Sequence, residues 1–233
     1  MSEKDNILGR IREALTASAP RPGTHGNGGG VAPHDHRPHD EEFRAWLPEV
    51  PESPQQRVDL FERNSTALKS EFIAVGDEVG QARALADLAA REGWERVAAH
   101  HGELVDSPTV ALALPTVWCS DGYAVDQLEA VDAGITQCDM LVAQTGSVVV
   151  TSRSAGGRAL SVLPPHHVVL ARRSQLVADM PEAFAKLADL YPDGYPSFLS
   201  FITGPSRTGD IERILVLGAH GPRKLTIIMR HED

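Results

Sequence analysis

The stretch Glu71–Ala99, EFIAVGDEVGQARALADLAAREGWERVAA, contains two short apolar runs separated by a segment rich in Ala and Leu. Short apolar runs are typical of buried strands, and the segment between them has the length and composition of a helix. We therefore predict a strand over 71–75, a helix over 77–92 and a strand over 96–99. A strand–helix–strand order indicates parallel strands with the helix packed on one face of the sheet.

Similar elements are predicted on both sides of this stretch. A helix is predicted over 54–69, and strands over 140–144 and 147–152 are joined by a tight turn at Thr145-Gly146. One or two helical turns over 158–163 are stopped by Pro164-Pro165 and are followed by a strand over 167–171 and by a helix over 181–190 with Asp179 as its N-cap. An apolar run covers 198–202, and strands over 214–217 and 225–229 close the sheet. The predicted fold class is α/β: a three-layer, open, mostly parallel sheet with helices on both faces and an antiparallel hairpin.

The N-terminal region differs in composition from the rest of the chain. Residues 1–18 have helical periodicity and are interpreted as a helix that packs on the body of the protein or docks to a partner. Residues 19–42 are rich in Gly, Pro and His and are interpreted as a flexible linker, because such a segment cannot bury a core. Its histidines are not predicted to form a metal site, since metal ligands need a fixed surrounding shell. Residues 43–233 are predicted to form a single α/β domain.

Composition excludes several classes of function. The formal net charge is −10, which argues against a nucleic-acid partner because such proteins carry a basic stripe. No run of about 18 apolar residues is present, so no membrane span is expected. The charged N-terminus lacks an apolar signal core, so a cytoplasmic protein with reduced cysteines is expected. The two cysteines, Cys119 and Cys138, do not form a cluster motif, and the motifs for nicotinamide, ATP and catalytic zinc sites are absent, so no cofactor is evident in this chain.

The first candidate ligand-binding segment is Thr203–Glu212, TGPSRTGDIE, which lies between two apolar runs. Its Gly204-Pro205 pair predicts a turn. Hydroxyls, backbone amides and the guanidinium of one arginine are suitable donors for a carboxylate or phosphate. The candidate ligand-binding residues are Thr203, Gly204, Ser206, Arg207 and Thr208, with Asp210 and Glu212 placed to orient Arg207. A polar loop whose arginine is held by its own acidic neighbours is an equally good interpretation.

A second candidate follows from the distribution of charge. No carboxylate occurs between Asp139 and Asp179, although the chain as a whole is acidic. This stretch contains Gly156-Gly157-Arg158, a glycine loop that leads into the predicted helical turns. Backbone amides at the start of a helix favour anions, so the loop is a candidate anion site. The alternative is a β-turn with a solvated arginine.

Two further turns supply weaker candidates. Thr145-Gly146-Ser147 can line a pocket, but G-x-S-x-G is absent and no base accompanies Ser147, so a simple hairpin turn is favoured over a nucleophile. His220 follows a strand and is a candidate acid or base, because an imidazole titrates near neutrality. A turn histidine that bonds a carbonyl is at least as good an interpretation.

Taken together, these segments resemble the lactate-utilisation protein C family, whose core is called the LUD domain. The blocks that carry the resemblance are Gly134–Thr136, Ala143–Ser147, Gly157–Ser161 with Leu163-Pro164, Thr203–Glu212 and Gly218–Pro222, and the resemblance covers roughly residues 43–229. The chain departs from the family pattern at Gln144, where the family often has Glu, and at Gly209, where it often has Ala.

The resemblance implies a fold like that of ribose-5-phosphate isomerase, glucosamine-6-phosphate deaminase and CoA transferases, which bind small anions at the strand ends. It also implies a subunit of a three-protein system that oxidises L-lactate to pyruvate, with the iron–sulfur clusters carried by partner subunits and a small anionic ligand bound by this chain. One alternative is a stand-alone enzyme acting on a phosphorylated or CoA-linked metabolite, although Gln144 cannot serve as the nucleophilic Glu of a covalent CoA transferase. Another alternative is a non-catalytic interaction module that uses the N-terminal helix and linker.

Overall fold

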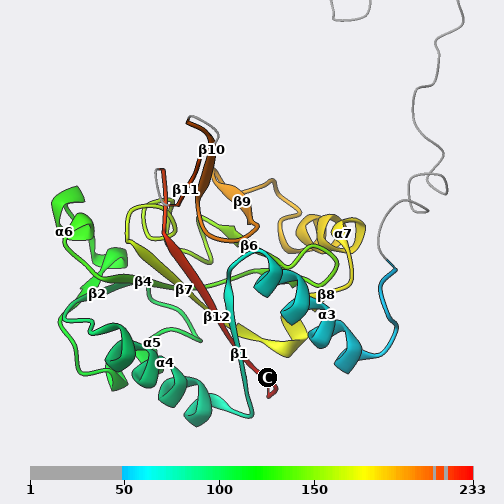
Figure 1. Cartoon of the computed structure of the whole chain (residues 1–233), viewed down its shortest axis with the longest axis horizontal. Helices are drawn as coiled ribbons and strands as arrows, with labels where there is room; N and C mark the ends of the chain where they lie inside the picture. The colour runs from blue at the N-terminus through cyan, green and yellow to red at the C-terminus, as the bar shows by residue number, and fades with distance from the viewer. Residues whose placement is uncertain (1–48, 212–213, 218–219, 233) are drawn as a thin grey trace, which may run out of the picture. The chain divides into compact units, whose positions relative to one another are not determined.

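A six-stranded parallel sheet organises the computed structural model, which describes residues 49–211, 214–217 and 220–232 (Figure 1). In order across the sheet, the strands are β1 (Glu71–Val75), β12 (Lys224–Arg230), β7 (His166–Arg172), β4 (Ala133–Gln137), β2 (Val97–Ala99) and β3 (Thr116–Trp118). Every pair of neighbours is parallel. The predicted strand–helix–strand unit is confirmed, but β12, β7 and β4 lie between its two strands. The predicted N-terminal helix and linker lie outside the described residues.

One face of this sheet is covered by helices α4 (Glu78–Glu92) and α5 (Asp106–Ala111). Leu85 and Leu88 of α4 pack on Val168, Leu170 and Ile228 of the central strands, and all five are almost fully buried. Helix α4 begins where the carboxylate of Asp77 accepts a hydrogen bond of 2.7 Å from the Gly80 amide. Near-continuous apolar strands are expected for a parallel sheet that is covered on both faces.

The opposite face is covered by helix α3 (Pro54–Ala67) and a second, four-stranded sheet. The strands of the second sheet are, in order, β8 (Leu176–Val177), β5 (Met140–Val142), β6 (Ser147–Thr151) and β9 (Leu199–Ile202). Helix α7 (Met180–Leu190), capped by Asp179 as predicted, packs on the outer face of this second sheet, and α6 (Val125–Glu129) packs beside β2. The α/β class, the mostly parallel sheet and the antiparallel β5–β6 hairpin are confirmed.

Two local predictions were wrong. Residues 158–163 form turns rather than a helix, because Pro164-Pro165 provides no amide to continue the helical bonding and only the Ala159 carbonyl is bonded in helical fashion. Strand β11 (Ile214–Leu217) does not join the main sheet but pairs antiparallel with β10 (Arg207–Ile211), which was predicted as a loop. Only two residues separate β10 from β11, and so short a connection can join only antiparallel strands.

The turn of the β5–β6 hairpin is packed tightly against helix α3. Gly146 has φ 66° and lies so close to α3 that a Cβ atom would come within 2.5 Å of the Ser65 amide nitrogen. The Asn64 side chain donates hydrogen bonds of 2.9 Å to the carbonyls of Ala143 and Gln144, the two residues that precede the turn residue Thr145. Glycine is therefore required at this position for two reasons: the backbone is left-handed, and the helix approaches too closely to leave room for a Cβ atom.

We expect Gly146→Ala to destabilise the fold by clearly more than the about 1–2 kcal/mol that a left-handed backbone alone costs an alanine. Gly93→Ala is the matched control, because Gly93 has φ 69° and no atom within 4 Å of an added Cβ. The measurement is the free energy of unfolding in urea for both variants. Equal losses would show that the turn does not depend on close packing against α3.

Candidate functional site: a cavity at the amino end of the sheet

A cavity of about 270 Å³ lies beside two of the loops selected from the sequence. The residues that line it are Ser161, Val162, His167, Phe198, Ser200, Ile202, Thr203, Gly204, Pro205, Ser206, His220, Gly221, Pro222 and Leu225. Its wall combines apolar side chains with hydroxyls and two imidazoles. Such a mixture is typical of small-molecule sites, and the volume suits a small metabolite rather than one as large as a CoA thioester.

The cavity lies at the amino end of the parallel strands. His167 and Leu225, which line it, are the second residues of β7 and β12. In open α/β sheets, ligands bind most often at the carboxyl ends of the strands. The two candidate loops that line the cavity, at 203–206 and 220–222, therefore lie at the edge opposite to the one that this rule favours.

Two segments selected from the sequence line this cavity, and a third is hydrogen-bonded to one of them. The Ser147 hydroxyl lies 2.8 Å from the Thr203 hydroxyl, which joins the β5–β6 turn to the loop at 203–206. The Ser206 amide donates a 2.9 Å hydrogen bond to the Pro222 carbonyl, which joins that loop to the turn at 220–222. Ser147 is 2% exposed, so its hydroxyl supports the loop rather than facing a ligand.

The two candidate arginines lie next to the cavity but do not line it. Arg207 donates from Nη2 to the Thr203 carbonyl over 3.2 Å, and its side chain is exposed. Arg158 donates from Nη2 to the Ser197 carbonyl over 3.3 Å and is also exposed. Arg207 is therefore bonded to the backbone of Thr203, which lines the cavity, and Arg158 is bonded to the backbone of the residue that precedes Phe198 of the cavity wall.

The glycine loop does not reach the cavity. A Cβ on Gly156 would collide with the His100 ring, which follows β2 at the carboxyl edge. The Gly157 amide donates to the Ser152 carbonyl over 3.0 Å and is not available to an anion. Thr145 and Gly146 form the hairpin turn against α3. Thr208 and Asp210 lie in β10, and Glu212 falls outside the described residues.

His167 also lines the cavity, although it is not among the candidate residues selected from the sequence. Its Nε2 lies 2.9 Å from the Thr136 hydroxyl, while its Nδ1 is buried and has no partner among the described residues. Burial, together with neighbouring His166, lowers the pKa of His167 to about 3. The paired histidines before an apolar run were the available signal, but only the tertiary structure shows that His167 lines the cavity. His220, in contrast, is exposed.

The fold and this cavity define an α/β protein with a candidate small-molecule site at one sheet edge. Residues 119–229 match the LUD domain family. The chain is similar to the Lactate utilization protein C of Bacillus licheniformis, with 27% identity over 97% of this chain and 95% of that protein. It is 39% identical to the Lactate utilization protein C of Shouchella clausii over 46% of this chain, and the match spans 47%, about half, of that relative's length.

The fold also matches a solved structure. The crystal structure of a DUF162 family protein from Deinococcus radiodurans superimposes with a TM-score of 0.61 at 22% identity, covering 77% of this chain and 99% of that one. At this level of identity the match concerns the fold alone. The expected resemblance to the lactate-utilisation protein C family and its LUD core is confirmed.

Within residues 49–211, 214–217 and 220–232, no group of three or more His, Cys, Asp or Glu side chains is arranged to hold a metal ion. None of the helices in these residues is long and apolar enough to cross a membrane.

The buried histidines predict a pH-dependent stability. Burial lowers the pKa of His166 to about 4 and that of His167 to about 3, whereas an unfolded imidazole titrates near 6.5. Their stabilising contribution is complete above pH 6.5 and is lost as the pH falls toward the folded values. We expect the free energy of unfolding in urea to be lower at pH 5 than at pH 7, by about 2 kcal/mol for each imidazole.

The matched variant is His166→Gln, which keeps a side chain able to bond the Thr226 hydroxyl, 2.8 Å from His166 Nε2. It should remove roughly half of the pH dependence, since one of the two imidazoles is gone. An unfolding free energy that is the same at pH 5 and pH 7 in the wild type would contradict the assignment of both rings as neutral.

Proposed function

We propose that this protein takes part in lactate utilization. The observation that carries the proposal is the match to a Lactate utilization protein C over 97% of this chain and 95% of that relative. Agreement along nearly the whole length supports a shared role better than a match to one motif does. The blocks quoted above, from Gly134 to Pro222, lie within or close to the region of the LUD domain match.

The proposed ligand is a small carboxylate that occupies the cavity at the amino end of the sheet. Hydroxyls of Thr203 and Ser206 line the wall and can donate to carboxylate oxygens. Arg207 is bonded to the backbone of Thr203 and supplies positive charge beside the site. His220 lines the same cavity and is exposed, so its imidazole is accessible to a ligand from solvent. A lactate- or pyruvate-sized anion suits the volume of about 270 Å³.

The redox chemistry of lactate oxidation is proposed to reside in iron–sulfur partner subunits. This chain contains two cysteines, Cys119 and Cys138, whereas a cluster is held by about four thiolates. Both thiols are buried and free, and burial raises the pKa of Cys119 to about 11 and raises that of Cys138 further. Thiols held in the neutral form are poor metal ligands, which supports the assignment of the clusters to partners.

Removal of the gene from the host should abolish growth on L-lactate and leave growth on an unrelated carbon source unchanged. A tagged copy of the full chain should restore growth, and affinity purification from the same cells should recover cysteine-rich iron–sulfur proteins. Undiminished growth on L-lactate after removal would overturn the proposed role. Restored growth with the tagged protein recovered alone would retain the role and reject the partners.

The cavity assignment predicts weaker binding of L-lactate or pyruvate to Arg207→Ala, by about 1.5–3 kcal/mol if a charged hydrogen bond is lost. Calorimetry on the purified full chain measures this. Arg57→Ala is the matched control, because Arg57 also bonds a backbone carbonyl, that of Pro51, and does not line the cavity. Ser206→Ala should weaken binding less, since it removes a neutral donor. Equal affinities in wild type and Arg207→Ala, with both folded, would reject Arg207 as part of the site.

A further inference from the structure

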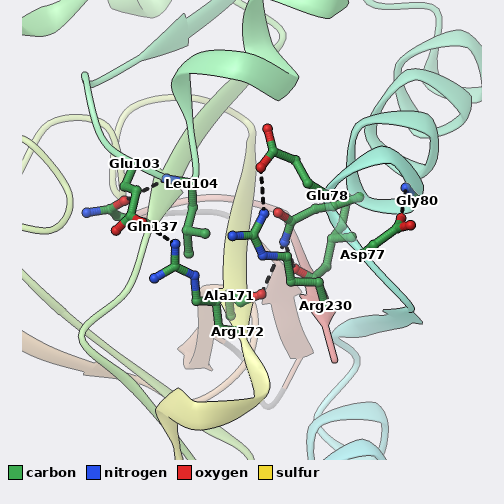
Figure 2. A network of polar contacts seen from close by, with 11 residues as sticks. Asp77, Glu78, Gly80, Glu103, Leu104, Gln137, Ala171, Arg172 and Arg230 are labelled. Carbon is green, nitrogen blue, oxygen red and sulfur yellow. Dashed lines mark hydrogen bonds and ion pairs between the residues drawn. The ribbon is translucent and has the colours of Figure 1, made fainter. Parts of the chain in front are cut away.

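Two arginines lie side by side at the carboxyl edge of the sheet, opposite to the cavity. Arg172 is the last residue of β7 and Arg230 is the last residue of β12, and the two are register partners on adjacent parallel strands. Because side chains alternate between faces, both lie on the α4/α5 face that holds Leu170 and Ile228. Figure 2 shows both guanidinium groups at this edge, with Gln137 of β4 nearby.

The protein balances these two charges with two glutamates that are loosely held. Arg230, 5% exposed, donates from Nη1 to Glu78 over 3.0 Å, and Arg172 donates from Nη2 to Glu103 over 2.5 Å. The side chains of Glu78 and Glu103 are 51% and 75% exposed. The pKa of Glu78 is lowered by hydrogen bonds from Ser107 and Arg230, and that of Glu103 by its bond from Arg172. Both glutamates can leave by side-chain rotation into solvent.

Most of the donor capacity of the two guanidinium groups is unused. An arginine carries five N–H donors, and each of these two makes one hydrogen bond within the part of the chain that the structure describes. The Nε atoms of Arg172 and Arg230 are both buried and without a partner among the described residues. Two like charges on adjacent strands repel each other, and structural ion pairs alone do not account for donors that are buried and left unpaired.

The position in the fold favours a ligand here. After β1 the chain passes to the α4/α5 face, whereas after β7 it passes to the opposite face, which carries the second sheet. Strand β12, which ends in Arg230, lies between β1 and β7. The chain segments that follow its two neighbours therefore leave toward opposite faces of the sheet. In open α/β sheets, ligands bind outside the carboxyl ends of the strands at such a change of direction.

We propose that Arg172 and Arg230 form a binding site for a dianionic oxyanion group, a phosphoryl group or a dicarboxylate carried by a small molecule. The ligand replaces Glu78 and Glu103, which occupy the site in its absence. Two guanidinium forks on adjacent strands, which lie roughly 4.8 Å apart, match the oxygens of such a group. This site goes beyond the proposed function, because it lies at the sheet edge opposite to the cavity and shares no residue with it.

The test is calorimetric titration of the purified full chain with inorganic phosphate and, separately, with malonate, at constant ionic strength. The wild type should bind at least one probe saturably, and the preferred probe shows whether the group is phosphoryl or dicarboxylate. Arg172→Gln and Arg230→Gln should each weaken that binding at least tenfold. The double variant Glu78→Gln/Glu103→Gln should strengthen it, because the competing carboxylates are removed.

Two controls separate this site from surface charge and from the cavity. Arg91→Gln removes an exposed arginine that is paired with Glu71, and it should leave the affinity unchanged. Ser206→Ala alters the cavity and should leave the affinity for phosphate unchanged. Circular dichroism identifies variants that fail to fold, and Arg172→Gln, at the less buried arginine, remains informative if Arg230→Gln does not fold. The proposal is overturned if neither the wild type nor the Glu78→Gln/Glu103→Gln variant binds a probe saturably. It is also overturned if folded Arg172→Gln binds with unchanged affinity.

Discussion

The parallel pairing of β7 with β12 is the interaction on which the rest of the structure depends. Seven residues of each strand are in register, from His166 opposite Lys224 to Arg172 opposite Arg230. Both strands are buried on both faces, with Val168 and Ile228 under the α4/α5 layer and Val169 and Ile227 under the second sheet. This strand pair places His167 and Leu225 at the amino-end cavity and Arg172 and Arg230 at the carboxyl end, so it determines the position of both sites.

The connection between these two strands builds the cavity. It contains β8, α7, β9 and the β10–β11 ribbon, and it returns to the amino end of β12 at the turn containing His220. A parallel pair requires such a crossover, whereas the β5–β6 hairpin needs only a tight turn. The hydrogen bonds Ser147–Thr203 and Ser206–Pro222 then hold the returning loop between the hairpin and the start of β12. The candidate site is thus assembled from segments far apart in the sequence.

Local patterns predicted the elements that have strong apolar runs or caps. The strand at 71–75, the helix begun by Asp77, the β5–β6 hairpin and the helix capped by Asp179 all form where expected. Strand β4 was not predicted, because Gly134, Thr136 and Gln137 interrupt its apolar pattern. Gly134 is required there since a Cβ would come within 2.5 Å of the Leu160 carbonyl oxygen, a contact that exists only in the folded chain. Among the candidate site residues, Thr203, Gly204, Ser206 and His220 meet at one cavity, while Gly156 packs on His100 at the other edge.

The sequence by itself determined the α/β class, most strands and helices, and the loops rich in donors, because these depend on local periodicity, turn residues and caps. Tertiary structure alone decided the order of the strands, the edge at which each loop lies, and the approach of Arg172 to Arg230. Those arrangements depend on contacts between residues far apart in the chain, such as the 58 positions that separate the two arginines. The local sequence does not specify such contacts, because they form only when the whole domain packs and both faces of the sheet are buried.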